Sequence, residues 1–505
     1  MANSFQKTLL EKKEFVYTLE LVPGRGSRGK TQDDVLRLAE ETARSGLIHA
    51  VSLTDNPGGR PALSPEALGL EIARLGIAPL IHLTCKDKNR NQLEAMLHSL
   101  DRMGITNLLA MTGDFPTTGF AGTPKPVFDL DALQLLHLLG QMNQGLDIDG
   151  KAPLPPTHFV KGCTVSPFKK FESELFAQYY KFHKKVALGA DFAVTQVGFD
   201  ARKFDELLRY RRLQGLGTPI LGNVYVLNRA VAKLMNQGTV PGCVVTDALY
   251  RLCETEAAAP DKGKAARLTR AAKQIALLKG IGYDGVHIGG PNLSHEDIVR
   301  IIGQSNEYAL RWEELVPEFS FPQEKGFYLF AKDERTGLNS DDFAPKGSNP
   351  RKAVGYSVMR CFHQVAFAPE APLYKPACWV FEKLDGTWCE GPVTEFEYWM
   401  KYLSSRCRRC GDCTLAEVAF LCPQSQCPKY LFNGQCGGSF EGWCEVFPGQ
   451  RKCIYVRAYD RLKAYGEEAS LREGYLPPRN WALDRISSWA NYFLQRDYRS
   501  KKIKI

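Results

Sequence analysis

Cysteine is the residue type whose spacing in this chain indicates chemistry most directly. Of 15 cysteines, eleven lie between Cys361 and Cys453. Cys407, Cys410 and Cys413 have the C-x2-C-x2-C spacing of iron–sulfur cluster loops. Zinc sites use similar cysteine spacings and thiolates suit both metals, so zinc stays open as the alternative. The candidate metal ligands are Cys407, Cys410, Cys413, Cys422, Cys427, Cys436, Cys444 and Cys453.

The number and context of these thiols favour metal over disulfides. Eight cysteines equal the ligand count of one pair of [4Fe–4S] clusters, and prolines follow Cys422 and Cys427 directly, as in many cluster loops. Residues 1–20 contain no apolar signal core, so we expect a cytoplasmic, reducing location in which a disulfide framework is disfavoured. We therefore predict one or two [4Fe–4S] clusters, or zinc.

A second set of chemically capable residues stands where apolar runs end in the first 300 residues. These polar or ionisable side chains are Glu20, Thr54, His82, Asp114, Ser166, Gln196, Tyr225 and His287. The apolar runs show little alternation, as expected of strands buried on both faces. They alternate with amphipathic stretches, among them Thr31–Ser45, Asn89–Arg102, Ser173–Leu188 and Lys264–Lys279.

Eight such units in about 300 residues predict a (β/α)8 TIM barrel, in which chemistry lies at the carboxyl ends of the strands. The expected strands are Phe15–Pro23, His49–Thr54, Pro79–Cys85, Asn107–Thr112, Phe159–Ser166, Phe192–Phe199, Pro219–Leu227 and Gly285–Gly290. We place the barrel at residues 1–303, a connector with little regular structure at 304–360, and a cysteine-rich α+β metal-binding domain at 361–505.

Residues 24–31 also match a phosphate-binding loop. Gly24, Gly29, Lys30 and Thr31 fit G-x-x-x-x-G-K-T between an expected strand and an expected helix. The eight repeated units and the cysteine-rich tail are not features of that nucleotide-binding fold. We therefore interpret the match as accidental, and the segment as a basic loop at the barrel mouth.

Four short pieces in order then indicate a family. They are Thr18-Leu19-Glu20-Leu21-Val22-Pro23, His82-Leu83-Thr84-Cys85, Gly113-Asp114-Phe115-Pro116 and Thr195-Gln196. Together they resemble the 5,10-methylenetetrahydrofolate reductases, which are flavin-containing (β/α)8 barrels, over about residues 12–303. The resemblance implies that Glu20 is the acid that helps open the folate ring, with a pKa raised by desolvation. It also implies that Asp114 contacts flavin and folate, and that Gln196 contacts folate.

The same resemblance gives the cofactor contacts. It places Thr54, His82, Thr112, Gly113, Asp114, Ser166, Lys184 and Lys185 at the flavin, with the lysine pair on its phosphates. Ser166, Lys170 and Gln178 stand where the short bacterial enzymes have a tyrosine, a histidine and an aspartate. Thr112 replaces an arginine. Because these departures fall mostly on flavin contacts, FAD and FMN both stay open.

The cysteine-rich half resembles the C-terminal methylenetetrahydrofolate reductase domain over about residues 350–465. The similarity includes Cys407–Cys413, Cys422-Pro423, Cys427-Pro428-Lys429, Cys436-Gly437-Gly438 and Gly442-Trp443-Cys444-Glu445-Val446. The implied enzyme reduces methylenetetrahydrofolate with electrons relayed from ferredoxin through the clusters. The alternatives are an NADH-dependent reductase with a structural zinc module, and a non-catalytic electron-transfer or scaffold subunit.

Composition limits the partners. The net charge of +9 suits anionic ligands or an acidic protein and does not by itself indicate nucleic acid. No apolar stretch approaches the roughly 18 residues of a membrane span. A homo-oligomer or a larger redox complex stays open.

Overall fold

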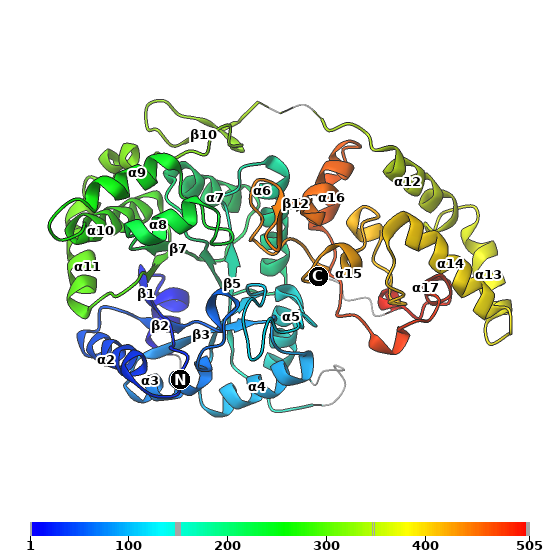
Figure 1. The fold of residues 1–505 in the computed structure, drawn as a ribbon, viewed down its shortest axis with the longest axis horizontal. Helices are drawn as coiled ribbons and strands as arrows, with labels where there is room; N and C mark the ends of the chain where they lie inside the picture. Colours follow the sequence, from blue (N-terminus) through cyan, green and yellow to red (C-terminus); the bar gives the residue numbers. More distant parts are fainter. Residues whose placement is uncertain (1–2, 147–152, 346, 348, 501–505) are drawn as a thin grey trace.

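The computed structural model describes residues 3–146, 153–345, 347 and 349–500. Eight parallel strands form a closed barrel in chain order, in which β1 also pairs with β8 (Figure 1). This confirms the predicted TIM barrel. The strands are β1 (Val16–Leu21), β2 (Ala50–Leu53), β3 (Ala78–Thr84), β4 (Asn107–Met111), β5 (Val160–Val165), β6 (Phe192–Thr195), β7 (Ile220–Tyr225) and β8 (Gly285–Gly289).

The barrel strands carry apolar side chains on both faces, toward the barrel interior and toward the surrounding helices. Every residue of β3 is buried, and the strands and helices share one large apolar core. The helices are α2 (Lys30–Ser45), α3 (Pro65–Arg74), α4 (Arg90–Arg102), α5 (Ala132–Asn143), α6 (Glu172–Ala187), α7 (Ala201–Leu213), α8 (Arg229–Asn236), α9 (Asp247–Glu256), α10 (Lys264–Ile281) and α11 (His295–Ala309). The four helices predicted by residue range are therefore present to within two residues at each end.

The amino-terminal segment closes one end of the barrel. Helices α1 (Ser4–Gln6) and η1 (Lys7–Lys12) bring Phe5 and Leu9 against the first residues of several strands, and the Phe5 ring meets Phe192 edge to face at 5.2 Å. Because that end is filled by apolar side chains, we expect a site at the carboxyl ends of the strands, where the fold class places chemistry.

The connector contains more structure than the sequence predicts. Helix α11 continues to Ala309, so a boundary at residue 303 falls inside it. A 3-10 helix, η3 (Trp312–Phe319), and a two-stranded hairpin of β9 (Phe330–Lys332) and β10 (Asn339–Phe343) follow. The prediction of little regular structure is wrong here because buried Phe319 and Leu338 attach this segment to the barrel through α7 and α10.

The cysteine-rich region is mainly helical. It contains α12 (Val354–Ala366), α13 (Tyr374–Leu384), α14 (Glu390–Ser405), α15 (Pro423–Gln426), β11 (Trp443–Cys444), β12 (Phe447–Lys452), α16 (Ile454–Lys463) and α17 (Ser488–Phe493). Helix α16 packs on α6, where the Tyr459 and Phe176 rings stack at 5.7 Å. Helices α12, α13, α14 and α17 lie beyond α16 on the side away from the barrel (Figure 1). No helix within the described ranges has the length and apolar character for a membrane crossing.

Candidate functional site

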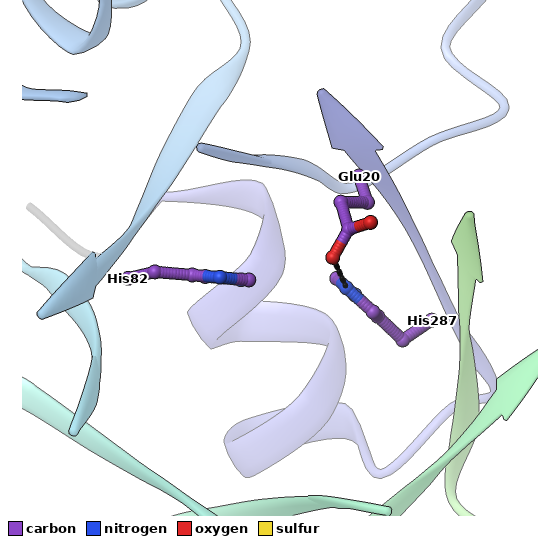
Figure 2. Close-up of side chains that lie close together, drawn as sticks. All are labelled: Glu20, His82 and His287. Carbon is purple, nitrogen blue, oxygen red and sulfur yellow. Dashed lines mark ion pairs between the residues drawn. The ribbon is translucent and has the colours of Figure 1, made fainter. Parts of the chain in front are cut away.

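Three ionisable side chains meet inside the barrel. Glu20 on β1, His82 on β3 and His287 on β8 point toward one another (Figure 2). The nearest Glu20 carboxylate oxygen lies 3.7 Å from His287 Nε2. Thr18 Oγ1 holds the other ring nitrogen, Nδ1, at 2.8 Å. The potential ligand atoms of the three residues all lie within 4.8 Å of one another, so the set can share a proton or hold a cation.

The electrostatics of this set correct one prediction. Burial raises the pKa of Glu20, but the His287 imidazole, with a smaller contribution from His82, outweighs burial, and the pKa of Glu20 is lowered overall. The predicted rise in the pKa of Glu20 is therefore wrong. The sequence shows His287 at a strand end but does not show that β8 pairs with β1 and brings this ring to the Glu20 carboxylate. Burial lowers the pKa of His82 to about 4, so this ring is neutral near pH 7.

Buried polar atoms without a hydrogen-bond partner mark the mouth as a ligand site. They include Thr54 Oγ1 and Ser166 Oγ, which directly follow β2 and β5, and His82 Nε2, which lies on β3 two residues before its end. A buried polar atom without a partner costs about 1–3 kcal/mol, so such atoms are expected where a polar ligand binds. All three residues are among the predicted flavin contacts, and their positions fit a polar ring system across the mouth. The flavin contacts themselves stay predictions.

The turn after β4 approaches the mouth closely. Gly113 adopts a φ of +87°, and a Cβ there would lie 2.9 Å from Thr84 Cβ, so only glycine fits. Asp114 accepts a hydrogen bond from the Gly58 amide at 2.9 Å. From the cysteine-rich region, Lys429 donates a hydrogen bond of 2.7 Å to the Gly113 carbonyl. Thr112, just before the turn, is buried.

Gln196 lies beside another loop of the cysteine-rich region. A Cβ on Gly242, whose φ is +77°, would lie 3.1 Å from Gln196 Nε2 and 2.8 Å from the Gly437 carbonyl oxygen. Gly242 thus stands between the predicted folate-contacting glutamine and Gly437. Lys169 donates to the carbonyls of Gly437 at 2.5 Å and Ser439 at 2.6 Å. The segment around Gly437 therefore forms part of the wall of the mouth.

Two positions that depart from the short bacterial enzymes contact the cysteine-rich region. Lys170 forms an ion pair of 2.5 Å with Glu441, and the Gln178 amide donates to Gln435 at 3.0 Å. The third, Ser166, is the buried hydroxyl already described. In this chain, positions 170 and 178 thus attach the barrel to its second half.

The predicted phosphate-binding lysines are both buried on α6. Burial lowers the pKa of Lys184 to about 8 and that of Lys185 to about 8. Lys185 donates to the Thr164 carbonyl at 2.5 Å, which brings its charge to the carboxyl end of β5. Lys184 lines a cavity between α6 and the cysteine-rich region, together with Asn433 and Tyr475.

The eight candidate metal ligands separate into two sets of four. The first cysteine group, defined as Cys407, Cys410, Cys413 and Cys422, lines one cavity. Lys401 Nζ lies 3.2 Å from Cys413 Sγ and 3.1 Å from the Glu397 carboxylate. Burial alone lowers the pKa of Lys401, but Cys413 and Glu397 raise it overall, so a cation stands beside the thiols.

The second cysteine group, defined as Cys427, Cys436, Cys444 and Cys453, lines a separate cavity. It too has a buried ion pair, between Lys429 and Glu445, and the Cys436 thiol donates to Glu445 at 3.4 Å. Cys422 and Cys427 flank the single turn of α15, so the two groups are neighbours. All 15 cysteines lie in the described part of the chain, and none forms a disulfide.

In the loop at residues 24–31, which matches a phosphate-binding motif, the Gln32 side chain bonds to the backbone. Gln32 donates to the carbonyls of Gly24 at 3.0 Å and Gly26 at 2.5 Å, and accepts from the Gly24 amide. A phosphate-binding loop needs its amides free to face the anion. The occupied Gly24 amide favours the interpretation that the match is accidental.

The sequence shows two of the important lysines without indicating their role. Lys429 follows Cys427-Pro428, but only the fold shows that it reaches Gly113, 316 positions earlier. Lys401 precedes the first cysteine group by six residues on α14, and its spacing does not indicate a contact with Cys413. His287 is recognisable as a strand-end residue, whereas its position opposite Glu20 follows from barrel closure between β1 and β8.

Together these features define a class: a TIM barrel with an acid and imidazole pair in its mouth and a two-group cysteine region attached there. The family model described as methylenetetrahydrofolate reductase matches residues 5–305, and one described as methylene-tetrahydrofolate reductase C terminal matches residues 389–482. The chain belongs to the methylenetetrahydrofolate reductase family. The resemblance inferred from the sequence is thereby confirmed.

Curated relatives match part of the chain. A probable methylenetetrahydrofolate reductase (NADPH) of Caenorhabditis elegans is 24% identical over 251 residues, which are 47% of this chain and 35% of the relative. The 5,10-methylenetetrahydrofolate reductase of Salmonella typhimurium is 27% identical over 163 residues, 32% of this chain and 47% of the relative. The chain thus spans less than half the length of either.

Among solved structures, an uncharacterized protein from Clostridium thermocellum, described as binding two copies of 5-methyl-5,6,7,8-tetrahydrofolic acid, aligns with a TM-score of 0.42 and 12% identity. The alignment covers 61% of this chain and 99% of that chain.

Proposed function

We propose that this protein reduces 5,10-methylenetetrahydrofolate to 5-methyltetrahydrofolate with electrons that enter through its cysteine-rich half. The reaction consumes two electrons and two protons. When bound, flavin supplies the hydride to the methylene carbon, and iron–sulfur clusters pass single electrons to flavin. A ferredoxin or a similar low-potential protein is the proposed donor.

The observation that favours this proposal most is the position of the second cysteine group. Its neighbour Lys429 contacts the Gly113 carbonyl directly, and the segment after Cys436 lies against Gln196 and Gly242. The second cysteine group therefore adjoins the mouth that contains Glu20 and the unpartnered Thr54, His82 and Ser166. A metal module with a purely structural role would have no need to adjoin the site.

The spread of the thiols favours clusters over single zinc ions. A tetrahedral zinc with bonds of about 2.3 Å holds its sulfurs about 3.8 Å apart. Across the described ranges, the one set of three or more His, Cys, Asp or Glu ligand atoms within 4.8 Å of one another is Glu20, His82 and His287. Within the described ranges, neither cysteine group therefore has three sulfur atoms as close together as one zinc ion requires. Four thiols around a wider space suit a [4Fe–4S] cube.

The chain's own residues then have separate tasks. Glu20 shares with His287, close to His82, the proton that it delivers to the folate nitrogen that leaves the methylene carbon. Asp114 orients the pterin, and Gln196 binds it from the end of β6. Thr54, His82, Thr112, Gly113 and Ser166 face the flavin ring, while Lys184 and Lys185 bind its phosphate. The expected cytoplasmic location and any oligomer stay predictions.

The direct test uses the full chain purified without oxygen. We expect about eight iron atoms per chain, bound flavin, and methyltetrahydrofolate formation with a reduced ferredoxin as donor. Protein that contains zinc without iron, and whose flavin is bleached rapidly by NADH, would favour the zinc-module reductase. Flavin-free protein without turnover would favour a scaffold subunit and contradict the proposal.

A further inference from the structure

An arginine-rich surface adjoins the first cysteine group. One depression is lined by Arg406, Arg408, Arg409, Arg451 and Arg485, which we call the arginine patch. Its single acidic lining residue is Asp484. Cys407 lines both this depression and the cavity of the first cysteine group, so the patch lies where that group comes nearest to solvent.

Most of this charge is not neutralised within the chain. Arg409 pairs with Glu395, and Arg485 lies 4.0 Å from Asp484. Among the residues that the structure describes, Arg406, Arg408 and Arg451 have no carboxylate oxygen within 4.0 Å, and all three are exposed. Exposed arginines grouped without counter-charges create a positive field that attracts an acidic surface.

The patch also has the apolar neighbours that protein interfaces use. At the end of α14, Tyr402 is 45% exposed and Leu403 79% exposed, and both line the same depression. Aromatic and arginine side chains are enriched in interfaces, where an apolar centre is surrounded by a charged rim. Transient electron-transfer interfaces are small, below about 1,200 Å² in total. A depression of this composition is consistent with such a contact.

The two cysteine groups lie one after the other between the arginine patch and the barrel mouth. The second cysteine group contacts the barrel mouth through Lys429, and α15 separates it from the first group. The first group adjoins α14, a helix that lies away from the barrel (Figure 1). Electrons that enter at the patch would therefore meet the two groups in sequence before the mouth.

We infer that the arginine patch is the docking surface for an acidic protein that carries a one-electron redox centre, of the ferredoxin type. This inference rests on the proposed function, because it requires a redox centre held by the first cysteine group. The partner's carboxylates pair with Arg406, Arg408 and Arg451, and its centre faces Cys407. Charge complementarity of this kind governs mainly the association rate and its dependence on salt.

The test measures electron entry by rapid mixing of the full, iron-containing chain with a reduced, acidic 2[4Fe–4S] ferredoxin. In the variant Arg406→Glu/Arg451→Glu we expect the second-order rate of reduction at low salt to fall on the order of 10- to 100-fold. The neutral Arg406→Gln/Arg451→Gln should lie between that variant and the wild type. The control Arg251→Glu/Arg300→Glu, with two exposed arginines on α9 and α11, changes the net charge equally and should keep most of the rate.

Two further measurements separate the possible failures. Reduced methyl viologen, a small cationic donor, should drive turnover equally in wild type and all variants, and iron content should be unchanged. If viologen drives no turnover in the wild type, the proposed function fails and the docking inference with it. If viologen works but ferredoxin reduces the charge-reversed variant as fast as the wild type, the docking surface is wrong. A variant that instead changes the oligomeric state would identify the patch as a contact between copies, which also overturns the inference.

Discussion

Lys429 Nζ lies 2.7 Å from the Gly113 carbonyl oxygen, across a chain separation of 316 residues. The same ammonium group forms an ion pair with Glu445, and both side chains are almost fully buried. Glu445 in turn accepts a hydrogen bond from Cys436 of the second cysteine group. One lysine therefore connects a predicted cluster ligand set with the turn that carries Asp114.

We predict that Lys429→Met destabilises the protein by about 3–5 kcal/mol, because it leaves the Glu445 carboxylate buried without its cation. It should also make the nearer cluster harder to reduce, since a positive charge that stabilises the reduced form is lost. Denaturation under anaerobic conditions and a potentiometric titration followed by EPR measure the two effects.

Two companion variants distinguish charge from packing. Lys429→Arg keeps the cation and should keep most of the reduction potential of the nearer cluster. Lys429→Met/Glu445→Gln removes both charges and should recover part of the lost stability and part of the lost reduction potential. An unchanged potential in Lys429→Met would show that this lysine does not act on a redox centre.

The four-plus-four division of the cysteines makes a quantitative prediction. Replacing one cysteine of either group, as in Cys413→Ser or Cys444→Ser, should remove about four of the roughly eight iron atoms, and replacing one in each group should remove nearly all. Cys378→Ser, outside both groups, should retain the full content. Iron analysis with EPR after reduction gives the count. Loss of both clusters from every single variant would contradict two independent sites.

The barrel could be predicted because its strands are apolar on both faces, a pattern such as Ala78–Thr84 that few other elements produce. Strand ends then indicated Glu20, Thr54, His82 and Gln196 without further information, because the fold class places chemistry there. The connector could not be predicted, since Phe319 and Leu338 become buried only through long-range contacts with the barrel.

Other parts of the site depend on distances that no spacing shows. Cys422 and Cys427 are five residues apart, and the single turn of α15 decides that they serve different groups. The downward shift of the Glu20 pKa required knowing that His287 faces it across the junction of β1 and β8. Local spacing therefore indicates which residues can bind metal or transfer a proton, but only the folded structure shows which of them lie together.

Glu20→Gln should lower methyltetrahydrofolate formation by about 10²- to 10⁴-fold, because the amide cannot supply a proton. The substitution keeps the shape of the side chain, so flavin content, iron content and reduction of flavin by ferredoxin should stay near wild type. Steady-state turnover and single-turnover flavin reduction, measured side by side, separate the two steps. Turnover that is unchanged in Glu20→Gln would exclude it as the acid and favour a barrel without catalysis.

The same reaction should depend on His287 in a different way. His287→Gln removes the main contact that lowers the pKa of Glu20. Burial, which raises this pKa, is then opposed only by the more distant His82, so the pKa of Glu20 should rise. The limb of the pH–rate profile that reports ionisation of Glu20 should therefore move to higher pH in this variant. Profiles of wild type and His287→Gln under saturating donor give the comparison, and an unchanged position of this limb would show that the pair does not share the proton.

The buried lysines of α6 predict how flavin affinity depends on pH. Lys184 and Lys185 each have a pKa lowered by burial to about 8, and only their protonated forms attract phosphate. Affinity should therefore be highest below pH 8 and fall as the pH rises from 7 to 9. Lys184→Met/Lys185→Met should bind flavin more weakly at pH 7, by roughly 10- to 100-fold per lost charge-assisted contact, and should show a flatter pH dependence. Flavin fluorescence titrations measure both, and Lys233→Met, an exposed lysine on α8, is the control. Equal pH dependence in wild type and the double variant would place the phosphate elsewhere.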